Sequence, residues 1–246
     1  MSSKILLELK EVHTHIGAYH ILHGVNLQIP RGELTLLLGR NGAGKTTTLR
    51  TIMGLWQASQ GSVHFNGHDI THMATPDIAS LNIAYVPENM GIFSDLTVEE
   101  NMLLAARKAS RAGQMDADRL AWIYAMFPAV EKFWHHPAGK LSGGQKQMVA
   151  IARAIIEPRQ LLLIDEPTKG LAPAIVQNLA EAFRALKAND TTILLVEQNF
   201  HFVRSLGDHV AVMDDGRIVH TGAMADLAAD EQLQHELLGL QAAPHH

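Results

Sequence analysis

The sequence predicts an α/β fold in which a parallel sheet core carries an antiparallel β subdomain and an inserted helical subdomain. Four continuous apolar runs are typical of parallel strands buried on both faces, and they are residues 34–38, 83–86, 161–164 and 193–196. Residues of about 90–157 show helical patterns and no strand pattern. The 246 residues are 47% apolar, which is enough to bury one large core.

The antiparallel strands are predicted near the two ends of the chain. Residues 25–29 alternate between apolar and polar, as in a strand with one buried face. Residues 63–65 do the same before Asn66-Gly67, a two-residue hairpin signal. A second hairpin turn is predicted at Asp214-Asp215-Gly216.

The helical insertion carries start and stop signals of its own. Residues 97–100 fit a capping box that opens a helix. A second helical stretch carries Trp122 and ends before Pro128, and a third helix should begin after Ser142. We therefore expect one domain, with a catalytic core at about 1–89 and 158–222, a helical subdomain at about 90–157 and a helical tail at about 223–246.

The segment after the first apolar run fits the phosphate-binding pattern G-x-x-x-x-G-K-[ST]. It reads Gly39, Arg40, Asn41, Gly42, Ala43, Gly44, Lys45 and Thr46, and Thr47 follows it. Glycines let backbone N–H groups turn toward a phosphate chain, and the following helix adds the partial positive charge of its N-terminus. Lys45 should contact the phosphates of ATP, and the Thr46 hydroxyl should bind Mg²⁺. The segment predicts a P-loop NTPase with a RecA-like sheet, and Gly39 to Thr47 are its nucleotide contacts.

Two acids, Asp165 and Glu166, end the apolar run at residues 161–164. Ligands of open parallel sheets gather at the carboxyl ends of the strands. Asp165 should therefore meet the Mg²⁺ that Thr46 also holds. Glu166 comes one residue later and should act as the general base for the attacking water.

A second anion site is predicted at Ser142, Gly143, Gly144 and Gln145, which precede an amphipathic helix. Ser142 can cap that helix, and the glycines leave backbone N–H groups bare for a phosphate. Such a site makes sense if it completes the nucleotide site of another subunit.

Segments 39–46, 141–145 and 161–166, in this order, resemble the nucleotide-binding subunits of ABC transporters over nearly the whole chain. The resemblance implies an ATPase that works as a head-to-tail dimer with a second ATPase subunit, either a related chain or a copy of itself. It also implies that Ser142 to Gln145 bind the γ-phosphate held by the P-loop of the facing subunit.

Finer motifs look like the smaller ATPase subunit of branched-chain amino acid importers, and they are residues 86–88, 167–173 and 196–199. That resemblance implies two membrane permease subunits and, indirectly, a periplasmic solute-binding protein. Similar relatives handle urea, short amides or other small solutes, so the solute stays open.

Several positions depart from the wider family, which has Gln, His and Asp where this chain has Glu88, Gln198 and Ala172. Glu88 can still bind Mg²⁺ or a water, so we place it with the metal ligands. Gln198 can donate a hydrogen bond to a γ-phosphate oxygen but carries no charge, and we place it with Glu166 in the catalytic group. The residue aligned with the family's adenine-stacking aromatic is Ile16, with Tyr19 three positions on, and both remain candidates.

Composition narrows the alternatives. A net charge of −5 and a pI of about 6.3 argue against nucleic acid as a partner, and the N-K-x-D element of guanine-specific proteins is missing from the sequence. The apolar runs fall short of the roughly 20 residues that span a bilayer, and the resemblance implies a peripheral subunit on the cytoplasmic face of the inner membrane. The alternatives are the ATPase of an exporter, for example of lipopolysaccharide, and a soluble ABC ATPase without a transport role.

Overall fold

The computed structural model describes residues 5–106 and 115–239, and a six-stranded sheet lies at its centre. The strand order is β10-β9-β3-β8-β7-β6. The bounds are β3 Leu34–Leu38, β6 Ile83–Val86, β7 Leu161–Asp165, β8 Thr192–Val196, β9 His209–Asp214 and β10 Arg217–Ala223. The five neighbouring strands β9, β3, β8, β7 and β6 pair in parallel, and β10 pairs antiparallel with β9. The four predicted parallel strands are confirmed.

A second, antiparallel sheet of order β2-β1-β4-β5 covers one side of the molecule. Its strands are β1 Ile5–Ile16, β2 Tyr19–Pro30, β4 Ala58–Phe65 and β5 His68–Asp69. The β4–β5 pair turns at Asn66-Gly67, as the sequence predicts. In β2, the alternating residues Val25, Leu27 and Ile29 are all buried.

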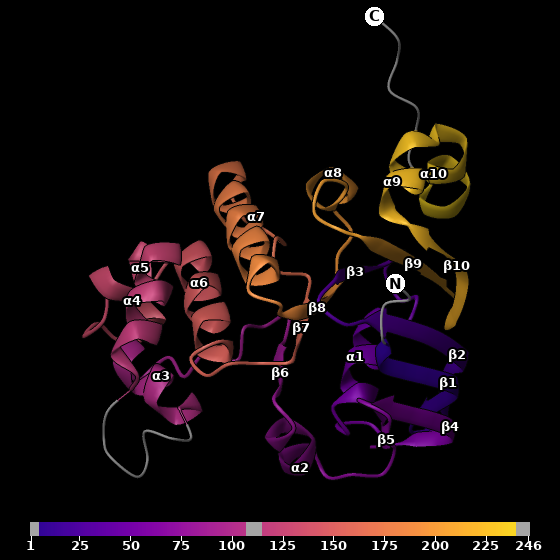
Figure 1. Cartoon of the computed structure of the whole chain (residues 1–246), viewed down its shortest axis with the longest axis horizontal. Coiled ribbons are helices and arrows are strands. Elements are labelled where there is room, and N and C mark those ends of the chain that lie inside the picture. Colours follow the sequence, from indigo (N-terminus) through magenta and orange to yellow (C-terminus); the bar gives the residue numbers. More distant parts are fainter. Residues whose placement is uncertain (1–4, 107–114, 240–246) are drawn as a thin grey trace, which may run out of the picture.

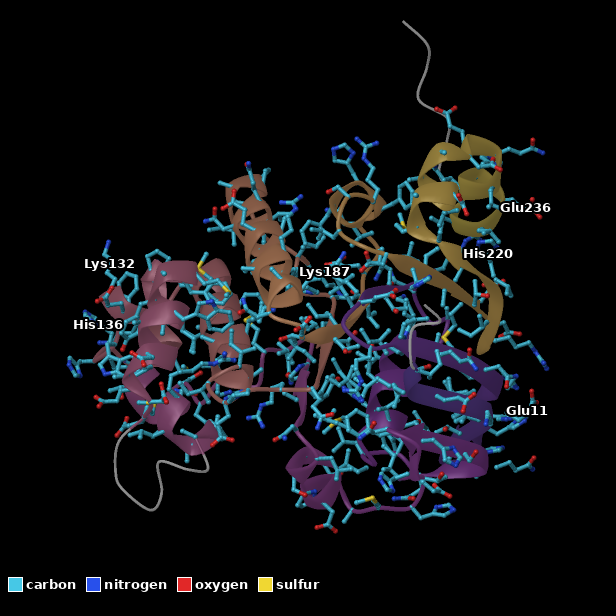
Figure 2. The ribbon with its side chains drawn as sticks, in the orientation of Figure 1. Glu11, Lys132, His136, Lys187, His220 and Glu236 are labelled. Carbon is cyan, nitrogen blue, oxygen red and sulfur yellow. The ribbon has the colours of Figure 1, made fainter. Side chains whose placement is uncertain are left out.

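The described helices lie mostly on the other side of the central sheet. They are α1 Lys45–Ile52, α2 Thr75–Ser80, α3 Val98–Ala105, α4 Ala117–Met126, α5 Pro128–Lys132, the 3₁₀ turn η2 Ala138–Lys140, α6 Gly143–Ala154, α7 Pro173–Ala188, α8 Phe200–Val203, α9 Met224–Ala229 and α10 Glu231–Leu238. Figure 1 shows α3 to α6 gathered at one side and the antiparallel sheet at the other. In Figure 2, Lys132 and His136 mark the outer edge of this helical subdomain, and Glu11 and His220 lie on strands at the opposite side.

Alternating side chains of the central sheet face two separate hydrophobic cores. Leu36 of β3 packs with the helical side, whereas its neighbour Leu37 packs with α1 and the antiparallel sheet. A strand buried on both faces favours apolar residues throughout, and β3 is apolar at every position except the buried Thr35. The sheet is therefore a rigid base for the loops at its carboxyl edge.

The predicted caps of the helical subdomain are present. Thr97 and Glu100 form a complete capping box at α3, and α4 ends at Met126 beside the fully buried Phe127. Parts of the predicted helical subdomain and tail, residues 107–114 and 240–246, lie outside the described residues. In the described part of the chain, none of the helices combines the length and apolar character that crossing a membrane requires.

Candidate functional site: a phosphate pocket at the carboxyl edge of the central sheet

The phosphate loop joins the end of β3 to the first turn of α1. Gly39 has a φ of 148°, and a Cβ there would lie 2.2 Å from the carbonyl oxygen of Met213. Gly44 precedes α1 with a φ of 106°, and a Cβ there would lie 3.0 Å from the side chain of Leu22. Only glycine accommodates both the backbone angle and the close approach, so the glycines of the motif are required by the folded backbone.

Lys45 begins α1, and its side chain folds back over the loop. Its Nζ donates to the carbonyl oxygens of Gly39 and Arg40, both at 2.9 Å, and lies 3.8 Å from Oε1 of Glu166. Burial lowers the pKa of Lys45, and the neighbouring Glu166 opposes that shift. The ammonium group is therefore fixed at the mouth of the loop, where a charge-assisted contact with a phosphate is strongest.

Two of the three predicted Mg²⁺ ligands, Thr46 and Asp165, are in contact with each other. Thr46 Oγ1 donates to Asp165 Oδ1 at 3.2 Å, and the Tyr85 hydroxyl donates to Asp165 Oδ2 at 3.4 Å. Asp165 is 1% exposed, and burial raises its pKa. Burial also raises the pKa of Tyr85 to about 12, so Tyr85 stays a donor. The sequence offers no signal for Tyr85, because it lies inside an apolar run.

This set of hydroxyl and carboxylate oxygens fits Mg²⁺, which proteins hold by one or two carboxylates together with substrate phosphates. The described residues contain no group of three or more His, Asp or Glu arranged to hold a metal by themselves. A cation here would therefore need the phosphate oxygens of a nucleotide to complete its ligands. The donor set supports a metal–nucleotide complex rather than a permanent metal site.

Glu166 follows β7 in a left-handed backbone conformation, with a φ of 45°. A residue other than glycine adopts this region at an energetic cost and is often found at functional sites. Its Oε1 accepts a hydrogen bond from Nε2 of Gln198 at 2.5 Å. The same Gln198 amide donates to Oδ1 of Asn41 at 2.6 Å. Gln198 therefore links the predicted general base to Asn41 of the phosphate loop. Gln198 and Asn41 are 157 residues apart in the sequence.

A buried carboxylate, Glu197, holds the two catalytic segments in place. It is 2% exposed, and its Oε1 accepts from the backbone N–H and the hydroxyl of Thr168, at 3.0 and 2.6 Å. Its Oε2 accepts from the backbone N–H groups of Gln198 and Asn199, at 3.0 and 3.2 Å. Glu197 was not a predicted site residue. An acid directly after a fully buried strand was the available signal, as it was for Asp165.

The pocket formed by these segments has a volume of about 350 Å³. Its lining residues are Ile21, Asn41, Gly42, Gly44, Lys45, Thr46, Thr47, Glu88, Glu166 and Lys169. The structure thus brings predicted residues from three separate segments to one place. Ile21 and Lys169 were not predicted. Ile16 and Tyr19 pair across the β1–β2 turn outside this lining, with Ile16 half-buried and Tyr19 76% exposed, and the adenine contact stays a prediction.

The predicted second anion site begins α6. Ser142 and Gln145 form a complete capping box, with Gln145 N donating to Ser142 Oγ at 3.3 Å and Ser142 N donating to Gln145 Oε1 at 2.9 Å. Gly143 is exposed, and a Cβ there would meet only Leu171, at 3.9 Å, whereas a Cβ at Gly144 would lie 3.0 Å from Ile175. Within the described residues, the pocket lining contains none of the residues 142–145. The two predicted phosphate sites of one chain are therefore separate.

Comparison with known proteins agrees with these features. Residues 22–169 match the protein family described as ABC transporter. The high-affinity branched-chain amino acid transport ATP-binding protein BraG of Pseudomonas aeruginosa is 36% identical over 235 residues, which cover 95% of this chain and 100% of that protein. The probable branched-chain amino acid transport ATP-binding protein LivF of Archaeoglobus fulgidus is 35% identical over 224 residues, covering 90% and 93%. A solved structure of an ATP-binding subunit of an ABC transporter superposes with a TM-score of 0.79 at 31% identity, covering 96% of this chain and 95% of that one.

Proposed function

Because the chain belongs to the ABC transporter family and is an ATP-hydrolysing transport subunit, we propose that it powers an importer of branched-chain amino acids or a related small solute. The observation that carries the ATPase part of the proposal is that Lys45 and Glu166 line one pocket, 3.8 Å apart, and that Gln198 donates a hydrogen bond to Glu166. The transport names of BraG and LivF support the choice of solute class.

In the proposed reaction, the N–H groups of the phosphate loop and Lys45 bind the phosphates of ATP. Thr46, Asp165 and Glu88 would hold Mg²⁺, which would neutralise phosphate charge when bound. Glu166 accepts a proton from the attacking water, and its strained backbone and its hydrogen bond from Gln198 fix the direction of the carboxylate. Both N–H groups of the Gln198 amide are used by Glu166 and Asn41, so Gln198 would give up its hydrogen bond to Asn41 to supply a neutral donor to the γ-phosphate, at the position where the wider family has a histidine.

The proposed active unit is a head-to-tail dimer in which residues 142–145 of one subunit complete the pocket of the other. The separation of these residues from the pocket within one chain supports this arrangement. The capping box consumes the Ser142 and Gln145 side-chain oxygens, and the exposed Gly143 leaves its backbone free to approach a phosphate. The second subunit is a related ATPase or a copy of this chain.

The proposed permease contact is the loop at residues 90–94 with the adjoining surface of α3. Phe93 is 54% exposed although it is firmly held, since buried Asn101 accepts from its N–H and donates to its carbonyl, both at 3.0 Å. Leu104 is also exposed, at 61%. Exposed apolar side chains on a fixed backbone favour a protein partner. Arg153 of α6 donates to the carbonyls of Met90 and Gly91, which links this surface to the helix that residues 142–145 begin.

The solute can be tested by uptake. A strain that lacks the chain should lose uptake of radiolabelled leucine, isoleucine and valine at low external concentration, and the wild-type gene should restore it, whereas Glu166→Gln should not. Unchanged uptake of all three amino acids, with loss of another solute such as methionine or a sugar, would reject the solute class and retain the ATPase role.

The permease contact can be tested separately by crosslinking. The chain has no cysteine, so a single Phe93→Cys substitution gives an unambiguous reporter. It should crosslink to a cytoplasmic loop of a permease subunit, whereas a cysteine placed at Lys132 should not. Crosslinking from Lys132 alone would place the permease elsewhere.

A further inference from the structure

The loop after Glu166 carries a lysine into the phosphate pocket. Lys169 Nζ lies 2.5 Å from Oε1 of Glu88 and 3.9 Å from Oε2 of Glu166. The Lys169 side chain is 61% exposed and that of Glu88 is 44% exposed, so neither group is trapped by packing. The ion pair joins segments 81 residues apart in the sequence.

The two lysines of the pocket have different surroundings. Lys45 is buried and donates to two carbonyl groups of the phosphate loop. Lys169 reaches the pocket from the loop after β7, and the contacts of its ammonium group are with the carboxylates of Glu88 and Glu166. The hydrogen bond and charge of Glu88 raise the pKa of Lys169, which keeps the ammonium charged. Lys169 therefore balances the negative charge that Glu88 adds to the pocket.

A carboxylate that is paired with an ammonium group is less available to a divalent cation, because both interactions use the same oxygen lone pairs and the same charge. We propose that Lys169 is a positioning residue that holds Glu88 in the nucleotide-free protein and competes with the divalent cation for its carboxylate, thereby setting the Mg²⁺ requirement of the pocket. This inference rests on the proposed role of Glu88 as a Mg²⁺ ligand.

The competition gives Lys169→Met two effects of opposite direction. Removing a positive charge from the pocket should weaken binding of nucleotide without metal. Freeing Glu88 should lower the Mg²⁺ concentration at which the metal complex forms. Exposed ion pairs are weak, so we expect each shift to be about twofold to fivefold. A lysine with only a structural role would weaken both kinds of binding together.

The probe is a ribose-labelled fluorescent ATP, whose binding is measured first in EDTA and then during a Mg²⁺ titration. Free nucleotide binds Mg²⁺ equally in every sample. A difference between variants in the midpoint of the Mg²⁺ titration is therefore caused by the protein. Lys169→Arg keeps the charge and should retain the wild-type midpoint. Lys132→Met removes one charge at the outer edge of the helical subdomain, marked in Figure 2, and should change neither quantity. Circular dichroism checks that every variant is folded.

Glu88→Gln completes the test. Alone, it should raise the Mg²⁺ midpoint, and in its background Lys169→Met should no longer lower the midpoint. If Glu88→Gln raises the midpoint but Lys169→Met leaves it unchanged or raises it, competition by Lys169 is wrong and the proposed metal site stands. If Glu88→Gln leaves the midpoint unchanged, the carboxylate charge of Glu88 does not attract the metal, and this inference fails while the ATPase role of the pocket stands.

Discussion

Replacing Gln198 with alanine separates a catalytic role of this residue from a structural one. Its amide donates to Glu166 at 2.5 Å and to Asn41 at 2.6 Å. The cap of α8 is its neighbour, since Asn199 Oδ1 accepts from Phe202 N at 3.1 Å. Gln198 therefore does not cap this helix through its side chain, and Asn199→Ala is the matched control.

The expected fall in kcat follows from the hydrogen-bond partners that Gln198 loses. A hydrogen bond to a charged group is worth about 1.5–3 kcal/mol, and a neutral one about 0.5–1.5 kcal/mol. Because the Gln198 side chain is exposed, water replaces part of the lost hydrogen bonding. We therefore take about 1.4 kcal/mol as the loss of transition-state stabilisation. That corresponds to about a tenfold fall in kcat. Hydrolysis should persist, since Glu166 and Lys45 remain in place.

The assay measures kcat, KM and thermal unfolding on both variants. Gln198→Ala should lower kcat about tenfold and change the free energy of unfolding by no more than about 0.5 kcal/mol. Asn199→Ala should cost about 1 kcal/mol of stability through the lost cap, which lowers Tm by about 2–4 °C, and should leave kcat unchanged. Gln198→His should add a pH step near 6.5 that the wild type does not show. A lower Tm with unchanged kcat for Gln198→Ala would refute the reasoning.

Four further predictions concern the pocket and the residues around it. Lys45→Ala should weaken nucleotide binding at least about tenfold, measured by fluorescence, because a charge-assisted contact of about 1.5–3 kcal/mol is lost; unchanged affinity would reject the phosphate-loop assignment. Glu166→Gln should bind ATP without hydrolysing it and should elute as a dimer in size-exclusion chromatography with ATP; normal turnover would contradict the general-base role. Glu197→Ala should lower the free energy of unfolding by about 3 kcal/mol or more in urea titrations, since four donors lose their acceptor, and Glu197→Gln should cost less. Ile16→Ala should weaken ATP binding about threefold through lost apolar contact with the base and leave inorganic triphosphate binding unchanged; the same effect from Tyr19→Ala alone would assign the adenine contact to Tyr19.

The sequence determined the features whose chemistry is local. The phosphate loop is one run of consecutive residues, and its glycines are required by the backbone angles and close contacts that the structure shows at Gly39 and Gly44. The capping boxes at Thr97 and Ser142 involve residues three positions apart, so they too could be predicted. Buried parallel strands are apolar at nearly every position, which made β3, β6, β7 and β8 predictable from the sequence.

The tertiary structure decided how those segments meet. The contact of Lys169 with Glu88, the acceptance of four hydrogen bonds by Glu197 and the presence of Ile21 in the pocket have no pattern in the sequence. Each depends on which strands are neighbours in the sheet and on the direction in which the chain leaves them, as the left-handed φ of Glu166 shows. Local propensity fixes neither of these, because both arise from packing between segments that are far apart in the chain.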